Sequence, residues 1–335
     1  MSTDASPARV IGIGASAGGL EALVRVVQCL PADFAGAICI VLHVPAMGRN
    51  LLASILARRA EVPIETARHG EPLAAGHVYV APSDRHLLVN EGKLELSRGP
   101  KENGVRPAVD PLLRSVAGYR ERGVAVVLSG TLGDGSAGAA AVARAGGVVI
   151  VQDSADALFP SMPETALGAV GPRAHVLEAP EIGKLLVKLS AETPQTRDNA
   201  VVTLPDEDPA YQRPEGPATG FTCPECSGAI WEVRDGDLVR YRCRVGHAYS
   251  EDAFVNGQRD SVEAAMWAAL EMLEERVELL RRIADRHGSS NPRTRKRLQD
   301  TAESTLERAE LIRRALRADA EPPDLLDREV APKAD

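Results

Sequence analysis

The chain has 335 residues, the length of about two domains at roughly 100 to 200 residues each, and 44% of its residues are hydrophobic. This apolar content excludes a mainly disordered protein. Acidic residues outnumber basic ones by 47 to 39, a formal net charge of −8, which argues against a nucleic-acid-binding protein. Aromatic residues make up only 3%, whereas 29 glycines and 23 prolines suit strand-to-helix turns better than an aromatic-packed β-sandwich.

Targeting signals and disulfides are not indicated by the sequence. No apolar run approaches the roughly 18 residues that a membrane span needs, and no basic segment precedes the first apolar run. We therefore expect a cytoplasmic protein that is not membrane-embedded. Five cysteines are an odd number: Cys29 and Cys39 lie singly in apolar segments, whereas Cys223, Cys226 and Cys243 form a downstream group. Such a group indicates metal ligands rather than a secreted disulfide framework.

Residues 8–190 alternate short apolar runs with segments of helical periodicity. Runs at 10–14, 37–43, 124–129 and 148–152 predict strands, and the apolar spacing after residue 19 and the alanine-rich segment near 137–145 predict helices. Strands separated by helices predict a doubly wound parallel α/β sheet that is covered on both faces. Residues 77–81 and 86–97 predict a strand followed by a hairpin at a sheet edge.

The remaining chain has four further segments. Residues 191–220 are proline-rich and predict a linker, and residues 221–250 are too few to form a core without a metal. Residues 251–317 predict two amphipathic helices, separated near Asn291 and Pro292, which form a helical hairpin or self-associate. The charged residues 318–335 predict a frayed tail. Each of the two predicted helices has one apolar stripe. The stripes consist of Val262, Met266, Ala269, Leu273, Val277, Leu280 and Ala284, and of Leu298, Ala302, Thr305, Ala309, Ile312 and Leu316.

A glycine-rich turn follows the first predicted strand and permits two interpretations. Gly12, Gly14 and Ala17 match a G-x-G-x-x-A dinucleotide fingerprint, but that motif also needs an acidic residue at the end of the second strand, where His43 stands. Alternatively, Ser16 is a nucleophile held on the tight turn, with the helix N-terminus behind it. The non-catalytic alternatives are a helix-capping serine and a histidine that is simply hydrogen-bonded.

Ser16 and His43 follow successive strands, and the carboxyl ends of parallel strands meet at one edge of a sheet. We therefore expect the two side chains to lie close together as nucleophile and base. A third residue should orient the imidazole, and the spacing leaves Asp134 and Asp153 as near-equal candidates. A helix N-cap is the structural alternative for Asp134.

Several motifs in order resemble the catalytic domain of the chemotaxis protein-glutamate methylesterases. They are the run from Ile11 to Gly19, Leu42-His43-Val44-Pro45, Arg106-Pro107-Ala108-Val109-Asp110, Leu128-Ser129-Gly130 with Gly133-Asp134-Gly135, and Gln152-Asp153 with Ser161-Met162-Pro163. The resemblance covers about residues 8–188. It implies that Ser16 is the nucleophile, His43 the base and Asp134 the orienting acid, on a doubly wound α/β fold.

Two positions depart from the pattern of that family. Thr131 stands where methionine is usual, and Ala17 stands where threonine is common. These changes affect the expected receptor choice and rate more than the reaction type. Regulated members also carry an upstream receiver domain, and only about eight residues precede the first predicted strand here. We expect no phosphorylation in cis.

Four potential metal ligands have the spacing C-x2-C, sixteen residues, then C-x3-H. They are Cys223, Cys226, Cys243 and His247. Two close ligand pairs joined by a hairpin predict a closed, structural zinc site of the zinc-ribbon kind. Loss of the metal should unfold residues 221–250 and leave the esterase domain folded, because the linker separates the two. The remaining histidines show no ligand spacing and should have ordinary core or surface roles; they are His69, His77, His86, His175 and His287.

The residues predict a serine hydrolase, and the resemblance implies that it removes glutamate methyl esters from chemoreceptor-like proteins. The resemblance adds glutamine deamidation as a second activity, and no cofactor is expected for catalysis. A non-catalytic signalling scaffold built on a degenerate esterase domain is the alternative outside enzymes. A dinucleotide-dependent oxidoreductase is the alternative enzyme.

Overall fold

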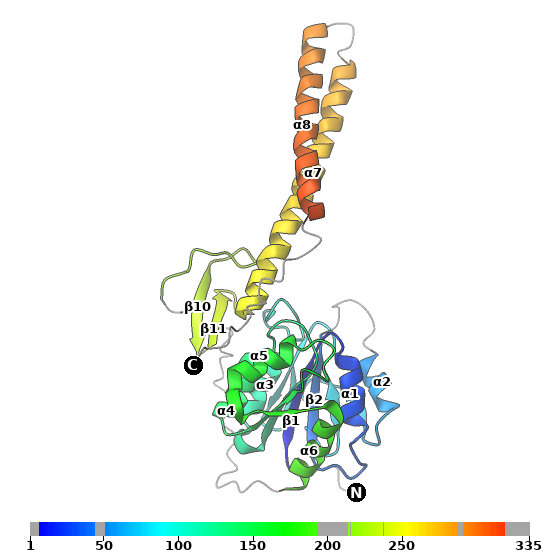
Figure 1. The fold of residues 1–335 in the computed structure, drawn as a ribbon, viewed down its shortest axis with the longest axis vertical. Helices are drawn as coiled ribbons and strands as arrows, with labels where there is room; N and C mark the ends of the chain where they lie inside the picture. The colour runs from blue at the N-terminus through cyan, green and yellow to red at the C-terminus, as the bar shows by residue number, and fades with distance from the viewer. Residues whose placement is uncertain are drawn as a thin grey trace, which may run out of the picture. The chain divides into compact units, whose positions relative to one another are not determined.

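The structure is a computed structural model that describes residues 7–43, 51–192, 214, 216–236, 238–286 and 291–318. The chain divides into two compact units, Met1–Asn256 and Gly257–Asp335. The first unit holds the α/β sheet and the cysteine-containing segment, and the second is helical (Figure 1). Most of the predicted linker, His287, and the tail beyond residue 318 lie outside the described residues.

The main sheet has seven parallel strands in the order β3-β4-β2-β1-β7-β8-β9. From the central strand β1 the chain first builds outward through β2, then crosses to the other side at β7. In open α/β sheets such a reversal of strand order marks the crevice where ligands bind. The strands are β1 (Val10–Ala15), β2 (Ala37–Leu42), β3 (Ile64–Thr66), β4 (Val78–Val80), β7 (Gly123–Val127), β8 (Val148–Gln152) and β9 (His175–Leu177).

Helices cover both faces of this sheet, as the alternating sequence predicts. On one face α1 (Gly19–Val27), α2 (Leu52–Ala57) and α6 (Ala179–Ala191) pack on strand residues such as Ile11 and Ile13. On the other face α3 (Val109–Ala117), α4 (Ser136–Arg144) and α5 (Ser161–Val170) pack on residues such as Val10 and Val127 (Figure 1). The predicted doubly wound α/β class is confirmed.

Two glycines of β1 face helix α3 at very short range. A Cβ added at Gly14 would lie 2.1 Å from Val109 Cγ1, and one at Gly12 would lie 2.7 Å from Leu113 Cδ2. The glycines therefore allow α3 to pack directly on the strand, because any larger residue would overlap the helix side chains. The first two glycines of the dinucleotide-like fingerprint thus have a packing role in this fold.

The hairpin of β5 (His86–Asn90) and β6 (Lys93–Ser97) differs from its predicted position. It forms a separate two-stranded sheet that packs on α3 and does not extend an edge of the main sheet, and β4 lies between β2 and β3. The reason lies in its alternation: Leu87 and Val89 share one face of the hairpin and are buried in the same core cluster as α3.

A small antiparallel sheet follows the linker. It consists of β10 (Ile230–Asp235), β11 (Leu238–Cys243) and β12 (Ala248–Tyr249). Its strands pair around a cluster that includes Tyr249 and Phe254. This sheet is bonded to the α/β domain, because the backbone N–H of Asn103 donates to the carbonyl of Ala248 at 2.7 Å. The linker therefore does not isolate the small sheet.

The second unit contains paired helices, as predicted. The helices are α7 (Glu251–Arg286), which begins in the first unit, and α8 (Pro292–Ala318). Asn291 Oδ1 accepts the N–H of Thr294 at 3.1 Å, which caps α8. Val277 and Ala309 from the predicted stripes are buried, whereas Val262 is exposed.

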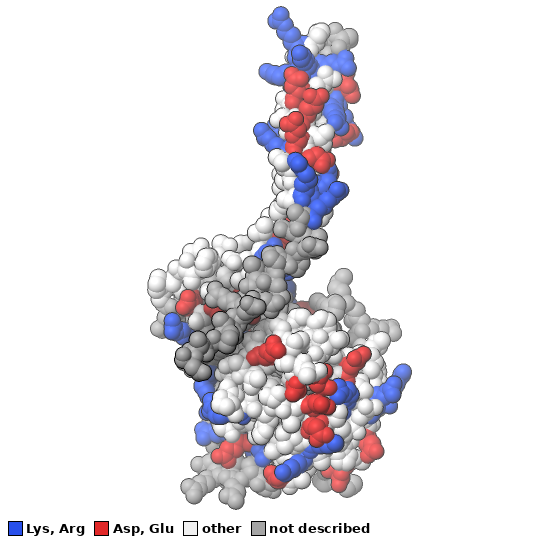
Figure 2. All heavy atoms as spheres, in the orientation of Figure 1, with Lys and Arg blue, Asp and Glu red and all other residues white. Residues whose placement is uncertain are grey.

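The surface of this unit carries both signs of charge. Arg313 forms an ion pair with Glu274 of the other helix. Figure 2 shows basic and acidic side chains along the same helices. The basic run from Arg293 to Arg297 is mainly exposed, in agreement with a solvated helix face. No helix among the described residues is long and apolar enough to span a bilayer.

The close contact of β1 with α3 predicts a stability difference between two glycine substitutions. Gly14→Ala should lower the free energy of unfolding by about 1–3 kcal/mol, because overpacking forces Val109 and its helix to move. Gly168→Ala, in α5, is the matched control: a Cβ there meets nothing within 4 Å, so stability should stay the same or rise by up to about 1 kcal/mol. Urea denaturation followed by circular dichroism measures both variants. Equal stabilities would contradict the packing role.

Candidate active site and metal centre

Ser16 lies immediately after β1, in the turn that leads into α1. Its N–H donates to the carbonyl of Ser129 at 2.9 Å, and its carbonyl accepts the N–H of Gly19 at 2.9 Å. Gly18 has φ +70°, a left-handed conformation that favours glycine, and it precedes the first residue of the helix. The turn thus fixes the Ser16 backbone at the carboxyl edge of the sheet, with its side chain half-buried.

The neighbouring loop after β7 approaches Ser16 closely. A Cβ at Gly130 would lie 2.8 Å from Ser16 Cβ and 2.1 Å from Met162 Sδ. The Ser129 hydroxyl donates to the carbonyl of Ala17 at 2.8 Å and ties the two loops together. Gly130 therefore leaves the space that Ser16 occupies.

His43 follows β2 at the same level of the sheet as Ser16. The pairing of Ala15 with Leu42 sets this level, and the N–H of His43 donates to the carbonyl of Ala15 at 3.1 Å. The side chain turns toward the loop after β7, where His43 Nε2 lies 2.7 Å from Asp134 Oδ2. Within the described part of the chain, the Ser16 hydroxyl has no hydrogen bond to this imidazole.

Asp134 is buried, and each of its carboxylate oxygens accepts two hydrogen bonds. Oδ2 accepts from His43 Nε2 and from the N–H of Val109, both at 2.7 Å. Oδ1 accepts from Asn103 Nδ2 at 2.9 Å and from the N–H of Asp110 at 3.1 Å. Since a carboxylate only accepts, the imidazole nitrogen that faces it carries a proton, and in the neutral tautomer Nδ1 is the nitrogen that can accept one.

These contacts keep Asp134 ionised. Burial acts to raise its pKa, but the hydrogen bond and charge of His43, together with the N–H groups of Val109 and Asp110, outweigh that effect. The pKa of Asp134 is therefore below its ordinary value. An ionised carboxylate beside an imidazole is suited to stabilising the imidazolium form during proton transfer.

The other candidates from the sequence occupy different places. Asp153, the rival of Asp134, lies in the turn after β8, where its Oδ1 accepts the N–H of Ala155 at 2.8 Å. His86 is buried; its Nε2 donates to the carbonyl of Pro100 at 2.9 Å, and its Nδ1 accepts the N–H of Ala108 at 3.2 Å. Burial lowers the pKa of His86. It is a satisfied core histidine, as expected.

Sequence reasoning missed Asn103, which donates to Asp134 and, at 3.2 Å, to Asp110. No motif or spacing marked this asparagine, because its role arises only when residues distant in the chain converge. Asp110 was part of the quoted Arg106 to Asp110 motif, but without an assigned role. Its Oδ1 accepts the N–H groups of Gly135 and Gly138, at 3.1 and 2.8 Å, and so caps the start of α4.

The four predicted metal ligands are brought together at one point of the small sheet. The ligand atoms of Cys223, Cys226, Cys243 and His247 all lie within 4.8 Å of one another. The distances are 3.7 Å between Cys226 Sγ and Cys243 Sγ, and 3.7 and 3.5 Å from His247 Nδ1 to the Sγ atoms of Cys223 and Cys243. A tetrahedral Zn²⁺ with Zn–S bonds of about 2.3 Å needs S–S separations of about 3.8 Å. The Cys3His cluster therefore fits a tetrahedral metal ion.

Comparison with known proteins identifies the α/β domain. The family model described as "CheB methylesterase" matches residues 11–186. The chain is 40% identical over 195 residues to "Protein-glutamate methylesterase/protein-glutamine glutaminase 2" of Anaeromyxobacter dehalogenans, a match that covers 56% of each chain. It is 39% identical over 191 residues to a protein of the same description, numbered 1, from Paramagnetospirillum magneticum, covering 55% of this chain and 50% of the relative. The chain thus spans about half the length of the curated relatives it matches.

A solved structure shows the same likeness. The Thermotoga maritima CheB methylesterase catalytic domain superposes with a TM-score of 0.51 at 34% sequence identity, covering 54% of this chain and 98% of that one. The matched region contains the strand ends that carry Ser16, His43 and Asp134 and ends before the Cys3His cluster. On the family model, which covers more than half of its residues, this chain belongs to the CheB methylesterase family.

Proposed function

We propose that this protein hydrolyses methyl esters of glutamate side chains on chemoreceptor-like proteins and also deamidates glutamine side chains there. The observation that supports the proposal best is the 2.7 Å contact of His43 with the buried carboxylate of Asp134, on the strand adjacent to Ser16. The relatives named above carry both activities in their descriptions. Membership of the family supports the same reaction class.

In the proposed mechanism, the Ser16 hydroxyl attacks the ester carbonyl while His43 Nδ1 takes its proton. The imidazolium then returns this proton to the leaving methoxide, so that methanol departs and an acyl-enzyme remains. Water repeats the sequence, with His43 again as base, and releases a glutamate carboxylate and free Ser16. Asp134 holds the imidazole orientation and stabilises its charge. The amides of Ala17 and Gly18 at the start of α1 would donate to the oxyanion.

The non-catalytic scaffold remains the alternative of a different class. It would require the Ser16, His43 and Asp134 positions to be without function, yet Asp134 accepts four hydrogen bonds that orient it toward His43. A dinucleotide-dependent enzyme has less support, since Gly12 and Gly14 contact α3 and His43 occupies the position of the ribose-binding acid. Nucleotide should cause no shift in the thermal midpoint.

We also propose that Cys223, Cys226, Cys243 and His247 bind one structural zinc ion. All four ligands come from the protein, and the Tyr249 hydroxyl lies 3.4 Å from Cys223 Sγ as a second-sphere contact. The ion would hold together a sheet that is too small to fold around a core of its own. A cytoplasmic location, the domain boundaries predicted from the sequence, and self-association through the C-terminal helices also stay proposals.

The nucleophile can be tested by one substitution. Ser16→Ala should abolish methanol release from methyl-labelled receptors and leave the fold intact, because one oxygen is removed from a turn fixed by its backbone. Ser261→Ala, on the exposed surface of α7, is the control and should retain full activity. Retention of more than about a tenth of wild-type activity by Ser16→Ala would be inconsistent with covalent catalysis.

The orienting acid is tested by comparing two aspartates at strand ends. Asp134→Asn should reduce kcat by about 10⁴, by the precedent of serine proteases, because an amide favours the wrong imidazole tautomer. Asp153→Asn should have little effect, because the side chain of Asp153 accepts a hydrogen bond from Ala155 in its own turn and lies away from His43. Steady-state methanol release measures both variants. Similar losses in the two would remove Asp134 from the mechanism.

The metal proposal predicts one zinc ion per chain in protein purified without chelator. Cys226→Ser should lose most of this zinc and unfold the small sheet, because it removes one of four ligands. Cys29→Ser should keep the zinc, since Cys29 bonds to backbone carbonyls of α1 and α6. Elemental analysis by mass spectrometry provides the measurement. A wild-type protein without zinc would contradict the proposal.

A further inference from the structure

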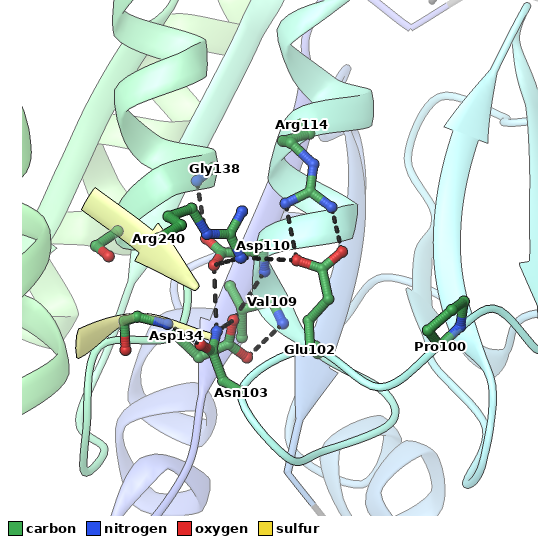
Figure 3. Close-up of polar contacts among 12 residues, drawn as sticks. Pro100, Glu102, Asn103, Val109, Asp110, Arg114, Asp134, Gly138 and Arg240 are labelled. Atoms are coloured by element: carbon green, nitrogen blue, oxygen red, sulfur yellow. Dashed lines mark hydrogen bonds and ion pairs between the residues drawn. The ribbon is translucent and has the colours of Figure 1, made fainter. Parts of the chain in front are cut away.

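Behind Asp134 lies a buried network of charged residues that the proposed mechanism does not use. It contains the carboxylates of Glu102 and Asp110 and the guanidinium groups of Arg114 and Arg240 (Figure 3). Arg240 Nη2 lies 2.9 Å from Glu102 Oε2 and 3.3 Å from Asp110 Oδ2, and Arg114 pairs with Glu102. Arg240 belongs to β11, three residues before Cys243, whereas the other charged groups come from the α/β domain.

The charges of the α/β domain do not balance in this network without Arg240. The side chains of Glu102, Asp110 and Asp134 are only 4%, 2% and 2% exposed, and Arg114 is the cation that the domain itself places against them among the described residues. Buried charges require partners, because desolvation is costly. Arg240, itself 12% exposed, adds the second cation. The Cys3His module thus supplies one of the two guanidinium groups that face Glu102 and Asp110.

Asn103 links the same module directly to Asp134. Its Nδ2 group uses one proton for Asp134 Oδ1 and one for Asp110 Oδ2, and its Oδ1 accepts the N–H of Ser250 at 2.8 Å. Only one amide orientation satisfies this arrangement, since the carboxylates accept and Ser250 N–H donates. The backbone N–H of Asn103 also donates to Ala248, the residue after His247. The side chain that steadies Asp134 is therefore held by residues next to the metal cluster.

The electrostatics of Asp110 show how finely this cluster is balanced. Burial and the neighbouring charge of Asp134 raise the pKa of Asp110 to about 6, although Arg240 opposes the rise. Arg114 and Arg240 together overcome the burial of Glu102 and lower its pKa well below its ordinary value. Loss of Arg240 would leave Asp110 with a still higher pKa and weaken its cap on α4, the helix that begins just after Asp134.

We propose that the Cys3His module completes the active site: Arg240, together with Asn103 held by Ala248 and Ser250, positions Asp134 against His43. This inference rests on the proposed hydrolase function of Ser16, His43 and Asp134. Arg240 and Asn103 are positioning residues, since neither contacts the reacting atoms. Metal binding is then coupled to catalysis, because a metal-free module withdraws Arg240 and the backbone contacts from the network.

The test compares two arginines of the same module in the full-length protein. Arg240→Met should lower kcat by about 10- to 100-fold with KM nearly unchanged, because a misplaced Asp134 no longer orients His43. Arg234→Met removes the same charge from the exposed part of β10 and should behave as wild type. Arg240→Lys keeps the charge but not the shared contact, and it should lose less than Arg240→Met.

The pH profile provides a readout that a purely structural role would not change. Removal of the Arg240 charge leaves Asp110, Asp134 and Glu102 opposed by Arg114 alone, so Asp110 takes up a proton at higher pH. A protonated Asp110 accepts the hydrogen bonds of Asn103 and of the first N–H groups of α4 less strongly, so the positioning of Asp134 weakens at higher pH than in the wild type. The acid limb of kcat/KM should therefore move to higher pH in Arg240→Met and stay in place in Arg234→Met. Both variants keep the buried His86, so this imidazole cannot cause a difference between them.

A second measurement does not require the receptor to be known. It is the rate at which a fluorophosphonate labels Ser16. Labelling needs an activated serine but no receptor, and it should slow in Arg240→Met and in Cys226→Ser while circular dichroism shows the α/β domain folded. If Arg240→Met does not fold, the same slowing in Arg240→Lys supports the proposal.

Two failures can be told apart. If the fluorophosphonate does not label the wild type and the wild type releases no methanol, the proposed function is overturned and this inference with it. A labelled, active wild type with Arg240→Met and Arg234→Met indistinguishable in rate and pH profile would overturn only the coupling.

Discussion

The buried carboxylate of Asp134 is the group on which the site depends. An ionised side chain at 2% exposure is tolerated only if its oxygens are fully hydrogen-bonded, and here four donors from three segments converge on it. These donors fix the start of α3, the segment containing Asn103, and the imidazole at the end of β2. The same contacts lower the pKa of Asp134. The hydrogen bonds that allow the carboxylate to be buried therefore also favour its ionised form beside His43.

This arrangement requires α3 to lie against β1 without intervening side chains. Gly12 and Gly14 permit that approach, and Val109, which fills the space over Gly14, is the residue whose N–H bonds to Asp134. A glycine pattern that resembles a nucleotide-binding fingerprint thus has a different physical cause. It lets a helix on one face of the sheet deliver backbone donors to the strand ends where Ser16 and His43 stand.

The Cys3His module extends the family domain in a way that follows from the same carboxylate. Asp134 and its neighbours concentrate three acidic groups in a volume that excludes water, and arginine is the side chain best suited to bridging such groups. One of the two arginines comes from β11, beyond the region that the family model matches. A short sheet that brings the Cys3His cluster together can hold such an arginine in place, which a linker segment could not.

The sequence by itself determined the doubly wound α/β class, the paired C-terminal helices and the clustering of three cysteines with His247. Each rests on a local pattern: the alternation of apolar strands and helices, the stripes along α7 and α8, or the spacing of cysteines. The placement of Ser16 and His43 at neighbouring strand ends also follows from the sequence, because parallel strands end at one edge.

Residue spacing left Asp134 and Asp153 as near-equal partners for His43, and the family resemblance favoured Asp134. Only the tertiary structure decided where the hairpin of β5 and β6 packs and what surrounds Asp134. Asp134 and Asp153 both follow strands, so their sequence contexts are alike, and the difference lies in which loop reaches β2. Asn103 and Arg240 carry no pattern of their own, since an asparagine in a turn and an arginine in a strand are ordinary on a surface. Their burial is created when segments more than a hundred residues apart converge, as with Arg240 and Asp110 at a separation of 130 residues. Long-range convergence of this kind leaves no local periodicity in the chain, and for that reason the sequence could not reveal it.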